Sequence, residues 1–139
     1  MPKSMTDAIE VRVGCDVQSI DDVRAAIEGS GERYLHRILG NGERAEASRL
    51  TSPELVARYV SGRFAGKEAV YKALRVRPEN ALGWSQIEIV ADETGAPRVR
   101  LSGAAAELST AAGVGDIAIS ISHATPFAFA VATAVATRT

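Results

Sequence analysis

A carboxylate and a lysine four positions apart, Glu68 and Lys72, are the residues of this sequence best suited to chemistry. They lie in the stretch GRFAGKEAVYKAL, residues 62–74, whose apolar spacing predicts an amphipathic helix. Residues four apart share one face of a helix, so both side chains point the same way. A carboxylate can hold a divalent cation and an ammonium group can hold a phosphate, so the pair favours phosphate chemistry.

A second carboxylate, Asp16, stands near the end of a predicted strand. Apolar residues alternate along residues 9–17, which predicts a half-buried strand ending near Asp16, from which a carboxylate can project beyond the sheet edge. Mg²⁺ prefers near-octahedral oxygen ligands and usually takes one or two carboxylates from a protein, a share that Asp16 and Glu68 would supply. The residues alone leave two other interpretations open. Asp16 can be a turn residue before a helix, and Glu68 can be a solvated partner of Lys72.

For the other candidate functional residues, a purely structural role is as well supported by the sequence as a functional one. His123 ends a predicted strand and is either a buried structural histidine or a ligand contact. Arg63 and Lys67 are expected on a solvated helix face. Cys15 lies in an alternating strand, so we expect a core thiol, and we expect His36 at the surface.

Caps, breakers and alternation predict the elements that position these residues. Ser52 at a cap and Pro53 at the first helical position start a long helix, which Pro78 must end. Further helices are expected after Ser19, over residues 34–39 (broken by Gly40-Asn41-Gly42) and over residues 103–112 after Ser102, and hairpins over residues 84–101 and 117–135, with Trp84 starting a strand. This order predicts a single α+β domain, a largely antiparallel sheet packed against one long helix and shorter helices.

Composition narrows the function class. The 139 residues carry 16 Lys and Arg against 17 Asp and Glu, a formal net charge of −1, which argues against nucleic-acid binding. A single cysteine excludes an internal disulfide and fits a reducing cytosol. The sequence has no apolar run of the ~18 residues that a membrane span needs and no secretory signal, so we expect a cytoplasmic protein without a membrane partner. One domain is expected over residues 9–135, with mobile tails at residues 1–8 and 136–139.

Three segments in order, with a tryptophan strand among them, resemble the small holo-acyl-carrier-protein synthases of the 4′-phosphopantetheinyl transferase superfamily. They are VGCDV at 13–17, RFAGKEA at 63–69 with Lys72, and SISH at 120–123, with WSQIEI at 84–89. The resemblance implies that family's fold and its Mg²⁺-dependent activity. This activity transfers the phosphopantetheine arm of coenzyme A to a serine of apo acyl carrier protein and releases adenosine 3′,5′-bisphosphate. It also implies a homotrimer with each active site between two subunits.

The resemblance assigns roles to individual residues. The family's metal-binding aspartate and glutamate fall on Asp16 and Glu68, its helix lysine on Lys72, and its coenzyme-contacting histidine on His123. Arg63 is one helix turn before Lys67 and is a further candidate for a coenzyme phosphate. Asp16, Glu68 and Lys72 are thus the expected catalytic residues. Either carboxylate, or a metal-bound water, could take the proton of the carrier serine, and the sequence leaves that choice open.

Two positions depart from the family pattern. Asp22 replaces an arginine that helps to hold the acidic, helical carrier protein, so docking must use other cations, of which Arg24 is the nearest. Gly66 stands where the family has alanine or a similar small residue. Glycine inside a helix lowers helix stability by ~1 kcal/mol relative to alanine. Gly66 therefore reflects either a close approach of the helix backbone to a neighbouring element or neutral sequence drift.

Two other functions compete with the transferase. A non-catalytic carrier-binding module would have kept the fold without the chemistry, but the joint presence of Asp16, Glu68, Lys72 and His123 counts against it. A different Mg²⁺-dependent phosphotransfer enzyme would use a nucleotide. The sequence lacks the Gly-x-x-x-x-Gly-Lys-Ser/Thr loop of the commonest nucleotide-binding scheme, which disfavours that alternative.

Overall fold

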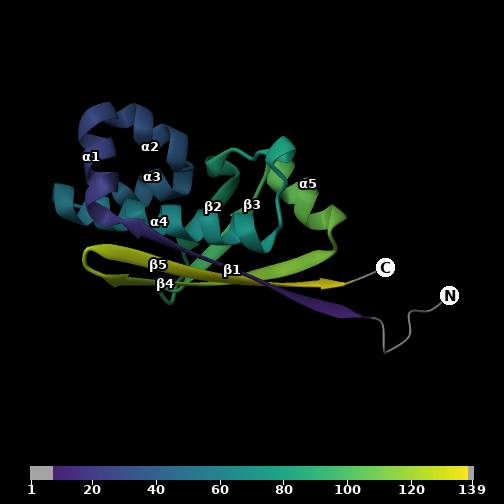
Figure 1. The fold of residues 1–139 in the computed structure, drawn as a ribbon. Helices are drawn as coiled ribbons and strands as arrows, with labels where there is room; N and C mark the ends of the chain where they lie inside the picture. The colour runs from purple at the N-terminus through teal and green to yellow at the C-terminus, as the bar shows by residue number, and fades with distance from the viewer. Residues whose placement is uncertain (1–7, 138–139) are drawn as a thin grey trace.

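The computed structural model describes residues 8–137 (Figure 1). Of the two expected tails, residues 1–7 and 138–139 lie outside the described residues, whereas residues 136 and 137 belong to the last strand. In chain order the elements are β1 (Ile9–Ser19), α1 (Ile20–Ser30), α2 (Glu32–Ile38), α3 (Asn41–Ala47), α4 (Pro53–Ala73), β2 (Ile87–Ala91), β3 (Pro97–Leu101), α5 (Gly103–Ala111), β4 (Val114–Ala124) and β5 (Phe127–Thr137). The predicted α+β class is confirmed.

The strands form two antiparallel sheets where the sequence predicted one. β4 and β5 form the predicted second hairpin, and β1 pairs with β5 from end to end, which gives a three-stranded sheet in the order β1-β5-β4. β2 and β3 form the predicted first hairpin as a separate two-stranded sheet. Trp84 lies in a 3₁₀ turn, Trp84–Gln86, directly before β2, so the prediction that it starts a strand is wrong.

The long helix α4 is the central element. Ser52 caps it by accepting a hydrogen bond from the Leu55 N–H, and Pro53 is its first residue, as predicted. The helix ends at Ala73, before Pro78, because Arg75 has a left-handed backbone with φ of 56°. Figure 1 shows α4 running along one face of the three-stranded sheet, with α1 to α3 beside its first half and the β2–β3 hairpin beside its middle.

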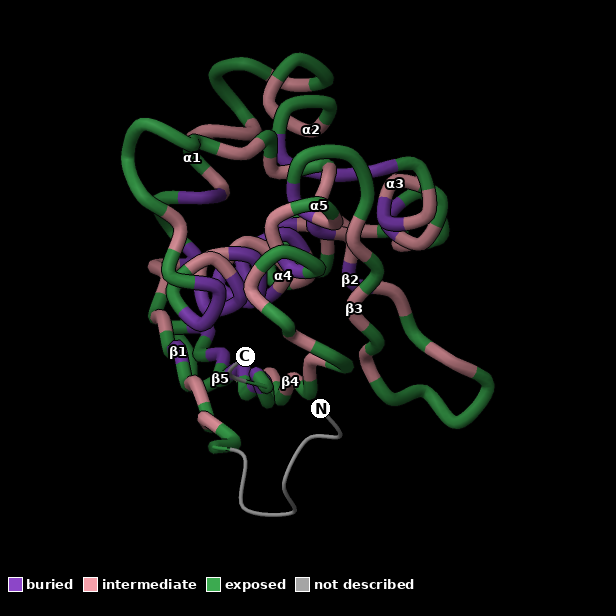
Figure 2. The backbone as a smooth tube through the Cα atoms, turned by 90° about the vertical axis from the view of Figure 1, so that its right-hand side faces the viewer, coloured by how far each residue is buried: buried purple, intermediate pink, exposed green. Residues whose placement is uncertain are grey.

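Small residues allow α4 to lie close to the sheet. β5 turns an alanine toward the helix at every second position, and each of these alanines is at most 2% exposed: Ala128, Ala130, Ala132, Ala134 and Ala136. Figure 2 shows the resulting buried stretch along α4 and β5. Gly66 on α4 packs against the Ile89 and Ile119 side chains, where an added Cβ would lie 2.5 and 3.0 Å from their Cδ1 atoms. This geometry favours close approach as the reason for that glycine.

The tightest contact between β1 and α4 is at Gly14. A Cβ built on Gly14 would lie 2.0 Å from the backbone oxygen of Ala69 and 2.9 Å from the Cβ of Lys72. Because backbone cannot rotate away from such a clash, we expect Gly14→Ala to lower the free energy of unfolding by about 3 kcal/mol or more. Unfolding by denaturant measures this change in the free energy of unfolding. Gly115→Ala, in a strand where an added Cβ meets nothing within 4 Å, is the matched control. An equal effect in both variants would contradict the assigned contact.

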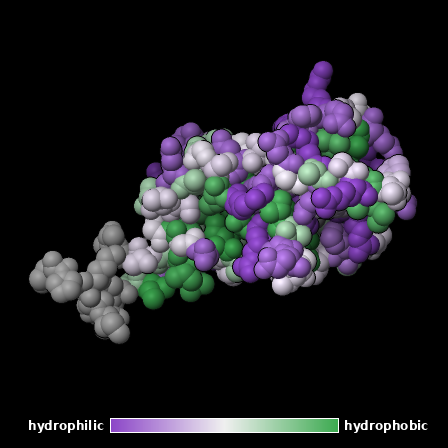
Figure 3. All heavy atoms as spheres, turned by 180° about the vertical axis from the view of Figure 1, so that it is seen from behind, coloured by the Kyte–Doolittle hydropathy of each residue, from purple (hydrophilic) through white to green (hydrophobic). Residues whose placement is uncertain are grey.

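The apolar side of β1 faces away from α4. The outward side chains are large and exposed on both β1 and β5: Ile9 68%, Val11 67%, Val13 65%, Val17 48%, Phe127 44%, Phe129 42%, Val131 46% and Val135 47%. We call these eight residues the outer apolar face. In Figure 3 apolar side chains gather next to the grey N-terminal residues, where β1 begins. Cys15 points the same way and is exposed, so the prediction of a core thiol is wrong. Alternation identifies the apolar side of a strand and not what covers it.

Two further details go beyond or differ from the sequence predictions. The helix over residues 34–39 is broken at Gly40, as predicted, but a further helix that the sequence did not predict, α3, starts at Asn41. The Glu43 carboxylate accepts a hydrogen bond from the Gly40 N–H, and the Glu88 carboxylate accepts one from the Gly42 N–H, so the first turn of α3 is satisfied. Ser102 occupies the cap of α5 without a side-chain hydrogen bond. Among the helices of the described part, none is long and apolar enough to cross a membrane.

Candidate active site between β1 and α4

Asp16 faces α4 because the polar side of β1 faces the helix. The strand continues to Ser19, so Asp16 lies within it and not at its end, which corrects the sequence prediction. Its carboxylate is held by two donors: Lys72 Nζ lies 3.3 Å from Oδ1, and Gln18 Nε2 donates to Oδ2 at 2.7 Å. Lys72 also donates to the Cys15 carbonyl at 2.9 Å. The Asp16 side chain is 14% exposed and that of Lys72 is 54% exposed, so the site opens to solvent on the lysine side.

Glu68 lies one helix turn before Lys72 and is partly buried. Burial raises the pKa of the Glu68 carboxyl above its ordinary value, the negative charge of Asp16 raises it further, and the Lys72 ammonium lowers it. The two carboxylates therefore interact electrostatically although they come from different elements. The sequence prediction that Lys72 pairs with Glu68 is thus incomplete, because the ammonium group is bonded to Asp16.

The donor set at this site fits Mg²⁺. Two carboxylates that repel one another gain from a cation placed between them, and carboxylate oxygens are the ligands that Mg²⁺ takes from proteins. Within residues 8–137, no group of three or more His, Cys, Asp or Glu side chains is placed to hold a metal ion. A structural zinc site needs four such ligands and a catalytic one needs three. Asp16 and Glu68 thus suit a metal that fills its remaining positions with water and phosphate oxygens.

His123 lies on the other edge strand of the same sheet. In the strand register Gln18 is opposite Ala128, and Ala128 is opposite His123, so one whole strand separates His123 from the Asp16 side. Its Nε2 lies 3.0 Å from the Arg58 carbonyl oxygen, in contact with α4. Burial lowers the pKa of His123 below its ordinary value, which favours the neutral imidazole. Within one chain His123 does not meet the Asp16 carboxylate.

Arg63 points to neither Asp16 nor solvent. Its Nε donates to the Ile89 carbonyl at 3.2 Å, its Nη2 lies 3.4 Å from a Glu46 oxygen, and its guanidinium carbon lies 4.4 Å from the centre of the Tyr59 ring. The side chain is 14% exposed, so the expectation of a solvated face is wrong. His36 is exposed, as expected.

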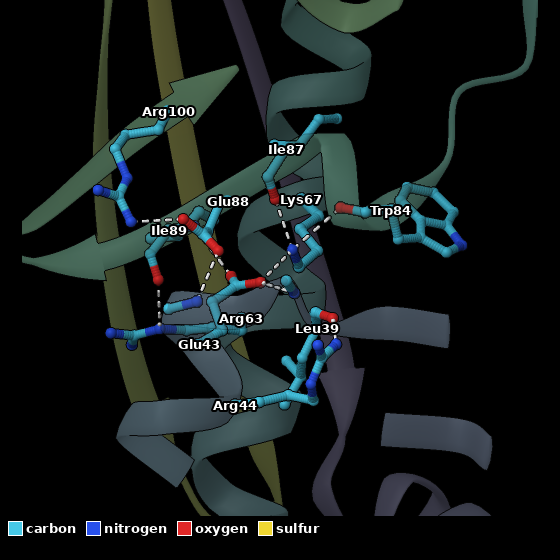
Figure 4. Close-up of polar contacts among 12 residues, drawn as sticks. Leu39, Glu43, Arg44, Arg63, Lys67, Trp84, Ile87, Glu88, Ile89 and Arg100 are labelled. Atoms are coloured by element: carbon cyan, nitrogen blue, oxygen red, sulfur yellow. Dashed lines mark hydrogen bonds and ion pairs between the residues drawn. The ribbon is translucent and has the colours of Figure 1, made fainter. Parts of the chain in front are cut away.

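Lys67 is completely buried, which contradicts the expected solvated face. Its Nζ donates to the Glu43 carboxylate at 2.6 Å, to the Trp84 carbonyl at 3.0 Å and to the Ile87 carbonyl at 2.5 Å (Figure 4). Both charged side chains of this pair have 0% exposure. Glu43 was not a candidate from the sequence. It also accepts a hydrogen bond from the Ile89 N–H at 2.9 Å.

The chain is similar to known proteins along most of its length. The sequence model described as the 4′-phosphopantetheinyl transferase superfamily matches residues 12–132. A holo-[acyl-carrier-protein] synthase of Chlorobaculum tepidum is 38% identical over 113 residues, covering 81% of this chain and 88% of the relative. The same enzyme of Ruminiclostridium cellulolyticum is 34% identical over 126 residues, covering 89% and 91%.

Solved structures are also similar to this chain over most of its length. The crystal structure of holo-ACP-synthase from Plasmodium yoelii has a TM-score of 0.82 and 28% identity, and the match covers 94% of this chain and 99% of that one. The Helicobacter pylori holo-[acyl-carrier-protein] synthase, solved in complex with coenzyme A, has a TM-score of 0.72 and 28% identity, covering 91% and 99%.

Proposed function

The chain belongs to the 4′-phosphopantetheinyl transferase superfamily, and we infer that it is a holo-[acyl-carrier-protein] synthase. It transfers the 4′-phosphopantetheine group of coenzyme A to a serine of apo acyl carrier protein and leaves adenosine 3′,5′-bisphosphate. The observation that carries this assignment to particular residues is the convergence of Asp16, Glu68 and Lys72 between β1 and α4. A cytoplasmic location remains a prediction.

Asp16 and Glu68 are the residues that would hold Mg²⁺. When bound there, Mg²⁺ neutralises charge on the pyrophosphate oxygens of coenzyme A and polarises the phosphorus under attack. Lys72 has room to turn from Asp16 to a phosphate oxygen, because more than half of its side chain is exposed. Its positive charge then offsets the negative charge that develops on the phosphoryl group.

Glu68, Asp16 or a water bound to the metal would take the proton of the carrier serine. The serine would lose this proton as its oxygen forms a bond to the β-phosphorus. The bond from that phosphorus to the bridging oxygen breaks, and adenosine 3′,5′-bisphosphate leaves with the bonding electrons.

Gln18 orients Asp16 for this reaction. Its amide donates to Oδ2, which leaves the carboxylate one fixed direction toward α4. Partners of this kind typically change metal affinity or activity by about 10–100-fold when they are removed. We therefore expect Gln18→Leu to raise the Mg²⁺ concentration for half-maximal transfer about tenfold. Gln86→Leu is the control, because the Gln86 oxygen accepts from the Ala105 N–H and contacts no site residue. An unchanged Mg²⁺ requirement in Gln18→Leu would remove Gln18 from the site.

The protein assembles as a homotrimer through the outer apolar face. An exposed apolar surface that spans two strands is typical of an interface between chains. β1 with Asp16 and β4 with His123 are opposite edges of the sheet, so one chain holds two separated half-sites. In the trimer, His123 of one chain contacts coenzyme A bound at Asp16 and Glu68 of the next. The assignment of Arg63 to the coenzyme is the weaker one, since its guanidinium is already bonded to Glu46 and Ile89.

The carrier protein is acidic, so its docking requires cations near the site. Arg24 on α1 and Arg58 on α4 line one pocket at the start of α4. Arg24 is partly neutralised by Asp21 at 3.4 Å and Glu54 at 3.7 Å, whereas Arg58 is exposed. Arg58 therefore joins Arg24 as a docking cation in place of the arginine that Asp22 replaces.

Intact-mass spectrometry of apo acyl carrier protein with this protein, coenzyme A and Mg²⁺ tests the function. A mass gain of one phosphopantetheine that EDTA abolishes is the expected result. Failure with several carriers, while the protein is folded and binds them, would favour the non-catalytic carrier-binding module instead.

A further inference from the structure

Side chains form the hydrogen bonds of one edge of β2. Within residues 8–137 this strand pairs with another strand, β3, on its other side only. At the edge away from β3, the carboxylates of Glu43 and Glu46 accept hydrogen bonds from the N–H groups of Ile89 and Ala91, each at 2.9 Å. Lys67 and Arg63 donate to the carbonyls of Ile87 and Ile89. We call Glu43, Glu46, Arg63 and Lys67 the edge network, part of which is drawn in Figure 4.

The spacing of the edge network matches the repeat of a strand. Outward-facing backbone groups on one edge recur every two residues, which is about 6.6–6.8 Å. Helix residues three or four apart have Cβ atoms roughly 5–6 Å from each other. Glu43 and Glu46 on α3, and Arg63 and Lys67 on α4, have those spacings. Two helices thus present acceptors and donors at nearly the period at which β2 presents its own.

Stability alone does not account for the inner part of the edge network, the buried pair of Glu43 and Lys67. Glu43 and Lys67 are both 0% exposed, and burial shifts their pKa values toward the neutral forms, upward for the acid and downward for the amine. Replacing a buried ion pair by apolar residues of similar size is often neutral or stabilising, whereas removing one partner leaves an uncompensated buried charge and is strongly destabilising. A fixed geometry is what the pair supplies and an apolar pair does not.

That geometry fixes the rotation of α4. All three ammonium donors of Lys67 are used, by oxygens of Glu43, Trp84 and Ile87. The next residue, Glu68, projects about 100° further around the helix. Side-chain ends lie roughly 5–6 Å from a helix axis, so a rotation of about 20° would move the Glu68 carboxylate by roughly 2 Å.

We propose that Lys67 and Glu43 are positioning residues of the transfer reaction, which hold α4 in the rotation at which Glu68 faces Asp16. The role of Glu68 rests on the proposed function. Lys67 touches no substrate and acts through the helix that carries Glu68. Misplacement by about 1 Å can lower a rate about 10²-fold, so the expected effect is large although the buried pair faces away from the site.

Lys67→Met, which keeps the length of the side chain and loses the ammonium, tests the proposal together with the isosteric Glu43→Gln. We expect the folded variants to need at least about tenfold more Mn²⁺ for half-saturation, measured by electron paramagnetic resonance in the presence of coenzyme A. We expect kcat to fall about 10²-fold and KM for coenzyme A to change little. Leu108→Ala on α5 trims the core without touching the edge network and controls for loss of stability.

The outcomes separate this proposal from the proposed function. Unchanged Mn²⁺ binding and kcat in Lys67→Met or Glu43→Gln would overturn the positioning role, and so would an equal loss in Leu108→Ala at matched thermal stability. If one variant does not fold, the other carries the test. A wild-type protein that binds Mn²⁺ but transfers nothing would refute the transferase. Weaker Mn²⁺ binding in Lys67→Met would still support the positioning of Glu68.

Discussion

Replacing Glu68 with Gln is expected to lower the rate of phosphopantetheine transfer by ~10³-fold, about 4 kcal/mol of transition-state stabilisation, without destabilising the fold. The substitution removes one of the two carboxylates that are proposed to hold Mg²⁺. The substitution is expected to raise the stability of the fold while it lowers the rate. The pKa of Glu68 is raised in the folded protein, first by burial and then by Asp16, so its ionised form is less favourable there than in the unfolded chain. A neutral glutamine removes that unfavourable term.

Asp16→Asn should lower transfer as much as Glu68→Gln, because the two carboxylates act as one site. Intact-mass kinetics with Mg²⁺ titration and thermal unfolding measure both quantities for each variant. Glu79→Gln, in the exposed turn after α4, is the control and should leave transfer unchanged. Transfer within tenfold of the wild type in either site variant would refute the assignment of that carboxylate.

The sequence predicted the residues of the site better than the geometry around them. A cap and a proline determine where α4 starts, and the i, i+4 rule places Glu68 and Lys72 on one face, because both are local properties of the chain. The contact of Lys72 with Asp16 joins residues 56 positions apart. The resemblance placed both residues at the site, but nothing in the sequence predicted this contact, since no local rule relates two such distant residues.

The burial of Lys67 was mispredicted for the same reason. Its partners Glu43, Trp84 and Ile87 lie 24, 17 and 20 positions away in the chain, and three of its neighbours on α4 are small. A lysine on a helix is expected to face solvent, because burying its charge is costly unless acceptors inside the protein bind it. The sequence did carry one signal, the similar spacing of Glu43 and Glu46 on one helix and of Arg63 and Lys67 on the next. This spacing becomes informative only when a strand edge is known to lie between the two helices.

The orientation of β1 was also mispredicted, and it connects the fold to the proposed function. A strand with one apolar side is expected to bury that side in its own domain. Here α4 covers the polar side, which turns Asp16 toward Glu68 and leaves the outer apolar face uncovered. The same alternation therefore turns the proposed metal ligand Asp16 toward α4 and exposes the proposed subunit interface, so the two proposals depend on one strand.

Placing a charge at the centre of that face should separate the subunits and abolish transfer together. Val131 lies on the middle strand, opposite Cys15 on β1 and Ser120 on β4, and is 46% exposed in the single chain. In Val131→Glu each interface would bury an unpaired carboxylate, which costs several kcal/mol, whereas the separate chain keeps it in water. We expect a folded monomer by light scattering and transfer lowered by ~10²-fold or more, because each half-site loses the other. Ala104→Glu, exposed on α5, controls for an added charge. A fully active monomer of Val131→Glu would show that one chain holds the complete site.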